Sequence, residues 1–467
     1  MGVIRPRAAA ARQLADSHAW HVTATVDARP LGRTGRPQRV SILSILGRVP
    51  WPWWLLAPWS AVWVGLQAHG GGQSWHFFAE GGRLLFSGGP AGGLQLYATH
   101  PVLQIGPLAL GISAVLQLLG PESGRMIALV AMSATGVPLL AALWRLLPAH
   151  ERRRDGRLLA AGLVFLPVWT ELTTHFGHLD DVLALGFSVV ATHAVSRRHP
   201  VWAGVALAAA VDSKPWAAAF VPLLLALPRK DRPAAFGAFG AGVAVAWLPF
   251  LAADPHSLIA ARFTIPNDYS SALRAIGVNS ARTPSWDRPA QLALGVAAGC
   301  VAVRRGRWPA VILLAVAARI LLDPGVYAYY TSGAVLGTIT FDLLVTRWRL
   351  PWMTAAATAL LYLTRFTHHL YPFTLHELGL LRAAFGIAVP VGVLCLPERW
   401  MRRPPGRHAR VTRHRQERQH QPRYQPQRFP GPARRVPPAR IDARHGISGG
   451  RRSSTRAGAG PHGPRPR

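Results

Sequence analysis

A succession of apolar stretches, separated by short basic breaks, runs from Trp51 to Pro397 and constrains this chain more than any other feature. Half of the 467 residues are hydrophobic, and 15% are charged against about 25% in soluble domains. This composition excludes a mainly disordered chain and disfavours a soluble two-domain protein. Cys300 and Cys395 both lie inside apolar runs, which excludes a disulfide scaffold. The pattern is typical of an all-α polytopic membrane protein.

The apolar segments can be counted, and their flanking charges predict sidedness. Basic breaks such as Arg152–Arg157 mark the cytoplasmic side, and breaks rich in acids, His, Tyr and Pro fall between them. Thirteen spans cannot join two cytoplasmic termini. We therefore expect about 12, with 101–119, which Gly106-Pro107 interrupts, lying in the interface or re-entering; the alternative is that it spans and Arg152–Arg157 lies outside. The segments are 51–67, 101–119, 126–147, 158–173, 179–195, 200–213, 215–228, 234–253, 290–304, 308–322, 328–346, 351–364 and 378–396.

The charge divides the chain into a membrane domain and two basic ends. Residues 1–48 carry eight Arg and two Asp, and we expect them to form a disordered cytoplasmic segment. They do not form a signal peptide, because the first apolar run begins only near Ile42. Residues 49–397 form the transmembrane domain, with large outer loops at 68–125 and 254–289. Residues 398–467 form an Arg- and Pro-rich disordered tail in the cytoplasm, which we expect to meet anionic lipids rather than nucleic acid. The chain as a whole carries a net charge of +32.

The mouth of the segment 179–195 gathers polar residues. His175, His178 and Asp181 repeat every three residues and would share one face of a helix. Such a set could bind a divalent cation. Alternatively, Asp181 or Asp180 could accept a proton from a substrate hydroxyl, with His178 as hydrogen-bond partner. A third interpretation is structural, because acids at a helix N-terminus satisfy free N–H groups.

Lys214 is one of only two lysines in the sequence, and it lies between two short apolar segments of about 14 residues each. An ionisable residue at membrane depth is costly and is a functional candidate by default. The alternatives are an ion pair with Asp212, or a side chain that extends to the interface.

A large outer region adds a second set of motifs. It contains SWHFFAEGGRLLFSGG (74–89) and the Tyr97-x-x-His100-Pro101 entry to the next apolar run, and it precedes Gly177-His178-Leu179-Asp180-Asp181, Trp202-Ala203-Gly204-Val205 and Lys214-Pro215. In this order, over about residues 50–350, the chain resembles the GT-C superfamily of membrane glycosyltransferases, especially actinobacterial family 87 mannosyltransferases. The resemblance implies transfer of a sugar, mannose in that family, from a polyprenyl-phosphate donor to a lipid or glycan hydroxyl on the outer face of the plasma membrane.

The resemblance also implies site residues. The superfamily places a catalytic acid in the first outer loop, where this chain has Gln73-Ser74, so either Glu80 or the Asp180/Asp181 pair has taken the base role, or catalysis is lost. The full set of expected residues is Asp181, Asp180 and Glu80 for catalysis; Lys214, Arg83, Arg262 and Arg274 for the donor phosphate; and His178, His76, Tyr329 and Tyr330 for the remaining substrate contacts. No cofactor is certain, and a divalent cation stays open.

Two other functions remain open at this stage. Charged residues within the membrane also occur in transporters and lipid-carrier flippases, but the sequence has no internal repeat that would favour them. The missing first-loop acid leaves a non-catalytic membrane scaffold as the other alternative.

Overall fold

The structure is a computed structural model, which describes residues 50–89, 91–148, 152, 155–257, 264–327, 329–366 and 372–402. These residues belong to one compact unit that ends at Arg402. Both predicted basic ends, up to residue 49 and from 403 onward, lie outside the described residues, as does Arg262.

The described residues are helical, and their only β-pairing consists of two isolated bridges, Pro266–Arg282 and Thr346–Met401. The all-α fold class is therefore confirmed for this part of the chain. The helices are α2 (Trp51–Gln67), α3 (Trp75–Leu85), α4 (Leu96–Thr99), α5 (Pro107–Gln117), α6 (Pro121–Ala134), α7 (Gly136–Arg145), α9 (Asp155–Thr170), α10 (Leu179–Arg197), α11 (Pro200–Ser213), α12 (Arg232–Ala253), α13 (Ala272–Ala275), α14 (Asp287–Arg304), α15 (Val311–Leu322), α16 (Tyr330–Leu344), α17 (Trp352–Leu361) and α18 (Leu375–Cys395), with a π-helix η3 (Glu171–Phe176) and 3-10 helices that include η4 (Pro215–Ala226) and η8 (Leu363–Arg365).

The expected count of about 12 spans is not confirmed. Five helical segments in the described residues are long and apolar enough to cross a membrane: Pro121–Arg145, Gly156–Phe176, Leu179–Arg197, Arg229–Ala253 and Leu375–Cys395. Other apolar helices are shorter, because prolines and glycines interrupt the runs on which the count was based. One of these is α5, whose 11 residues reach only about 16 Å, against a hydrocarbon core of about 30 Å.

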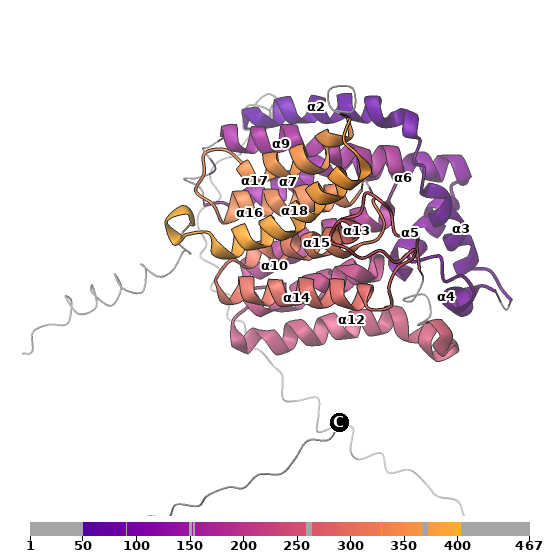
Figure 1. The fold of residues 1–467 in the computed structure, drawn as a ribbon. Coiled ribbons are helices and arrows are strands. Elements are labelled where there is room, and N and C mark those ends of the chain that lie inside the picture. Colours follow the sequence, from indigo (N-terminus) through magenta and orange to yellow (C-terminus); the bar gives the residue numbers. More distant parts are fainter. Residues whose placement is uncertain are drawn as a thin grey trace, which may run out of the picture. The chain divides into compact units, whose positions relative to one another are not determined.

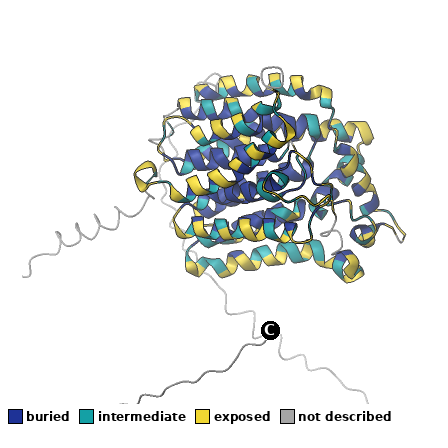
Figure 2. Ribbon diagram, in the orientation of Figure 1, coloured by how far each residue is buried: buried dark blue, intermediate teal, exposed yellow. Residues whose placement is uncertain are grey.

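The long helices lie side by side, with α2 against α9 at one edge and α12 at the opposite edge (Figure 1). Burial is concentrated in the helices between them, and exposed residues predominate on the outer ones (Figure 2). Only 11% of the most apolar window of Arg229–Ala253 is buried inside the protein. A helix that is apolar on all sides and exposed is suited to contact with lipid, so this surface supports a membrane protein.

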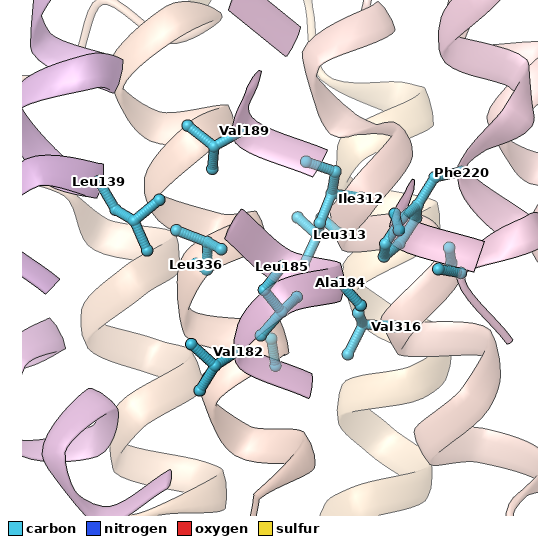
Figure 3. Close-up of a cluster of buried hydrophobic side chains, with 14 of the residues drawn as sticks. Leu139, Val182, Ala184, Leu185, Val189, Phe220, Ile312, Leu313, Val316 and Leu336 are labelled. Carbon is cyan, nitrogen blue, oxygen red and sulfur yellow. The ribbon is translucent and has the colours of Figure 1, made fainter. Parts of the chain in front are cut away.

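The core joins α10, α15 and α16. Side chains of α10, including Leu185, meet Leu313 of α15 and Leu336 of α16 in one cluster (Figure 3). At Gly337 of α16, an added Cβ would lie 2.7 Å from the Cα of Leu313, so only glycine permits this approach of the two helices. This packing holds the start of α10 beside the loop between α15 and α16, where the polar residues collect.

The backbone around Lys214 is fixed by its neighbours. Lys214 is extended (φ −147°, ψ 108°), as expected for a residue before proline, so α11 ends at Ser213 and η4 begins at Pro215. The backbone N–H of Gly106 donates to the carbonyl of Ser213 at 2.9 Å, and a Cβ on Gly106 would collide with the carbonyl oxygen of Asp212 at 2.1 Å. The start of the interrupted segment 101–119 therefore holds the turn that presents Lys214.

Candidate active site

The approach to α10 is a break in helical structure. After η3 the chain turns at Gly177, which has the left-handed φ of +66° that favours glycine. The backbone N–H of Gly72 donates to the carbonyl of Thr174 at 2.9 Å, and that of Ser74 donates to the carbonyl of Phe176 at 2.8 Å. The first outer segment is thereby fastened alongside the residues that lead into α10. The expectation that His175 shares a helix face with His178 and Asp181 is wrong, because this break separates them, and the ring of His175 packs on that of His69 at 5.1 Å.

Two carboxylates and one ammonium group form the centre of the site. Lys214 Nζ donates to Asp180 Oδ2 in a close contact, and it donates to Asp181 Oδ2 at 3.2 Å. Asp180 and Asp181 are 1% and 2% exposed, and the Lys214 side chain is 12% exposed. The alternative pair between Lys214 and Asp212 is not the one that forms. Because two buried acids share one cation, the three groups carry a net negative charge when all are ionised.

His178 lies at the edge of this cluster. Its Nδ1 is 3.5 Å from both Asp180 Oδ1 and Asp181 Oδ2, and its ring packs against Tyr329 with centroids 3.8 Å apart. The Oγ of Ser74 is 2.9 Å from its Nε2. Ser74 was not among the predicted residues, although the sequence marked it as standing where the family has an acid. It places a hydroxyl, rather than a carboxylate, on the outer side of the imidazole.

The helix-capping interpretation is compatible with this geometry. Asp180 and Asp181 occupy the first turn of α10, and Asp180 Oδ1 accepts a hydrogen bond from the backbone N–H of Asp181 at 2.8 Å. The same carboxylate thus satisfies a free N–H group and pairs with Lys214. Capping alone does not account for the lysine, which comes from a different helix connection.

A second charged group lies next to the first. Arg319, in α15, donates to the hydroxyl of Tyr330 at 2.5 Å and pairs with Asp323 at 3.3 Å. The rings of Tyr330 and Tyr329 are 4.9 Å apart, and that of Tyr327 stacks on Tyr329 at 5.0 Å. Sequence reasoning missed Arg319, although a lone arginine inside an apolar run was the signal that could have found it.

Two groups near Asp323, at the rim of the site, have shifted pKa values. Burial raises the pKa of Asp287, at the first residue of α14, to about 6, and the negative charge of Asp323 adds to the shift. Burial, together with Asp323, also raises the pKa of the Tyr327 phenol. Both shifts favour the uncharged form at this rim.

The other predicted residues lie elsewhere. Glu80 pairs with Arg83 on the exposed face of α3, roughly opposite Trp75 and Phe78, which are buried. The imidazole Nδ1 of exposed His76 is 2.8 Å from the carbonyl oxygen of Gln73. Arg274 stacks on Tyr269 with its guanidinium carbon 4.1 Å from the ring centroid. The described contacts bring none of these residues to the cluster around Lys214.

The sequence also allows a divalent cation bound by His178 and the two acids, and the geometry around Lys214 shows whether these residues fit one. The ligand atoms of His178, Asp180 and Asp181 lie within 4.8 Å of one another, which is a suitable nitrogen and oxygen donor set. However, Lys214 Nζ already lies between the two carboxylates and supplies the positive charge there. A resident ion would have to displace the lysine, so these residues do not fit a metal ion in this arrangement.

The fold and site define a helical membrane protein with a buried, charged cluster under a rim of tyrosines, which is an arrangement suited to an enzyme. Residues 106–277 match the family model of glycosyltransferase family 87, which confirms the resemblance found in the sequence and supports a glycosyltransferase enzyme. The match includes His178, Asp180, Asp181 and Lys214, whereas Ser74 and the tyrosines lie outside it. No curated protein and no solved structure matches the chain.

Proposed function

We propose that this protein is an integral membrane glycosyltransferase that moves a sugar, mannose, from a polyprenyl-phosphate donor to a hydroxyl group of a lipid or glycan. The reaction takes place on the outer face of the plasma membrane, and both termini lie in the cytoplasm. The observation that carries the proposal is the convergence of Asp180, Asp181 and Lys214 within the segment that matches family 87.

The base is Asp181. Asp180 accepts hydrogen bonds from Lys214 and from the backbone, whereas Oδ2 of Asp181 faces Lys214 and His178, and its Oδ1 has no hydrogen bond or ion pair with the described residues. The acceptor hydroxyl gives its proton to Asp181 as its oxygen bonds to the anomeric carbon. The bond from that carbon to the phosphate oxygen breaks, and polyprenyl phosphate leaves with the electron pair.

The surrounding groups orient these reactants. Lys214 holds the two carboxylates in place and balances one of their charges. His178 is held between Ser74 and the ring of Tyr329, and it presents a hydrogen-bonding group at the edge of the cluster. The stacked rings of Tyr327 and Tyr329 offer apolar faces of the kind on which sugar rings pack.

The test is sugar transfer by the purified protein, supplied with labelled polyprenyl-phosphate mannose and a membrane lipid extract. We expect a labelled lipid or glycan product from the wild type, and none from Asp181→Asn at equal protein level, because an amide cannot accept the proton. Glu80→Gln is the matched control, since this acid is exposed and paired on another face.

The outcomes separate the elements of the proposal. Full activity of Asp181→Asn would remove the base role. Transfer from another polyprenyl-phosphate sugar, but not from the mannose donor, would correct the sugar. No transfer from any donor would overturn the enzymatic function and leave the transporter and scaffold alternatives.

A further inference from the structure

The phosphate of a lipid-linked donor needs cations, and among the described residues Lys214 and Arg83 are already held in ion pairs. Lys214 pairs with Asp180 and Asp181, and Arg83 pairs with Glu80 on an exposed surface. Arg274 lines a different cavity with Tyr269. Two other arginines of the described residues, Arg365 and Arg382, line a separate cavity.

A cavity of about 290 Å³ lies between α13, the loop that joins α15 to α16, η8 and α18. Its wall contains Arg365 and Arg382 together with Tyr327, Tyr330 and Thr331, and one acid, Asp323, which pairs with Arg319. This volume is at the lower end of the roughly 300–1,000 Å³ typical of small-molecule sites, so it suits a head group rather than a whole lipid.

The two arginines that line this cavity have different partners. Arg365 forms a two-pronged ion pair with Glu171, through contacts of 2.7 and 2.9 Å, and Glu171 is 4% exposed. Arg382 donates one described hydrogen bond, at 2.7 Å, to the carbonyl of Ser270. It lies seven residues into α18, one of the five helices that could cross a membrane. A cation within such a helix is costly, which marks it as a functional candidate.

Among the charged groups around the cavity, Asp323 pairs with Arg319 and Glu171 with Arg365, and Arg382 has no ion pair with a described residue. Arg365 and Arg382 are close enough for their positive charges to oppose each other. The carboxylate of Asp268 acts on Arg382 from a distance, without an ion pair, and accepts hydrogen bonds from the backbone and hydroxyl of Ser270. Because a guanidinium has five N–H donors, Arg382 retains donors that an oxyanion in the cavity can use.

We infer that this cavity binds the phosphoryl group of a lipid-linked ligand, with Arg382 and Arg365 as its cations and Tyr327, Tyr330 and Thr331 as its polar and aromatic wall. The inference rests on the proposed function, because it names the place where the donor head group docks. It moves the phosphate contact from Lys214 to the arginines of the last helices.

The position of the cavity fits this role. Tyr327 and Tyr330 form its wall, and both rings pack on Tyr329, which in turn packs on His178. The tyrosine rings thus connect the wall of this cavity to the residues around Lys214. A sugar attached to a phosphate beside Arg382 would extend along these rings toward Asp181.

The experiment measures binding without transfer. Wild-type protein in detergent is titrated with farnesyl phosphate, with farnesol as the neutral counterpart and with inorganic phosphate, and thermal unfolding is followed. We expect farnesyl phosphate to raise the unfolding temperature at concentrations where farnesol does not, and inorganic phosphate to act only at higher concentration. Arg382→Gln should weaken farnesyl phosphate binding about tenfold or more, since it removes a charged hydrogen-bond donor.

The choice of variants keeps the test informative. Arg365→Ala would leave the buried Glu171 without its partner and destabilise the fold, so Arg365→Lys is used instead. Arg274→Gln, at the other cavity, is the matched control and should bind as the wild type does. Thermal unfolding without ligand checks that Arg382→Gln folds.

Each result decides the matter. Farnesyl phosphate binding by Arg382→Gln equal to that of the wild type, or equal stabilisation by farnesol, would overturn the anion site. Stabilisation by inorganic phosphate at the same concentration as by farnesyl phosphate would overturn the lipid-linked ligand. Charge-dependent binding by a protein that transfers no sugar would uphold the site and refute the proposed function instead.

Discussion

Replacing Lys214 by methionine should destabilise the protein more than replacing either of its acidic partners. In Lys214→Met, Asp180 and Asp181 stay buried, at 1% and 2% exposure, with no ammonium between them. Removing one partner of a buried ion pair costs about 3–5 kcal/mol. In Asp180→Asn, Lys214 keeps Asp181 at 3.2 Å, so we expect a loss of about 1.5–3 kcal/mol, the value of one charged hydrogen bond.

The free energy of unfolding can be measured in mixed micelles with increasing SDS, followed by tryptophan fluorescence. Lys230→Met is the matched control, because the chain has one other lysine and it is exposed; the expected change is within about 0.5 kcal/mol. A triple variant with Asn at 180 and 181 and Met at 214 should regain most of the stability, since no buried charge remains. Equal stability of Lys214→Met and Lys230→Met would refute the reasoning, as would a loss in Asp180→Asn as large as in Lys214→Met.

Three further changes test the site and its rim. Ser74→Ala should lower kcat about tenfold and leave donor KM unchanged, because it frees the His178 ring without removing a charge; steady-state kinetics would contradict this with an unaltered kcat. Glu80→Gln and Arg83→Gln should each keep wild-type activity in the transfer assay, since their pair is exposed and screened by solvent; a large loss would place α3 in the site after all. Asp287→Asn should be more stable than the wild type at pH 7.5 and equal to it near pH 4 in thermal unfolding. The pKa of Asp287 is raised from 3.8 to about 6 in the folded state, so the wild type loses stability as the pH rises between these two values. A stability difference that is constant across pH would exclude this cause.

Much of the helical structure could be predicted from local hydropathy. The predicted segments 51–67 and 200–213 coincide with α2 and α11, because apolar runs bounded by proline, glycine and arginine leave the backbone few alternatives. The expected span count is not confirmed, for a related reason. The length of an apolar run can be read from the sequence. The sequence does not show whether that run packs against neighbouring helices or against lipid.

The polar residues divide in the same way. Asp180, Asp181 and Lys214 could be chosen from the sequence, because ionisable groups beside long apolar runs are costly to bury and are retained for a purpose. Their placement in one site could also be predicted, and the structure confirms it, but the sequence left Asp212, two positions from Lys214, as an alternative partner for the lysine. The outcome depends on how α10 and α11 are rotated against each other, which local pattern does not encode.

The sequence by itself determined that this is a helical membrane protein, where most of its helices begin and end, and which charged residues are costly enough to matter. Only the tertiary structure decided that Ser74 reaches His178, that Glu80 turns to Arg83 on an exposed surface, and that Arg365 and Arg382 face one cavity. The physical reason is that solvation of a segment depends on its own residues, whereas the partner of a side chain depends on packing between segments far apart in the chain.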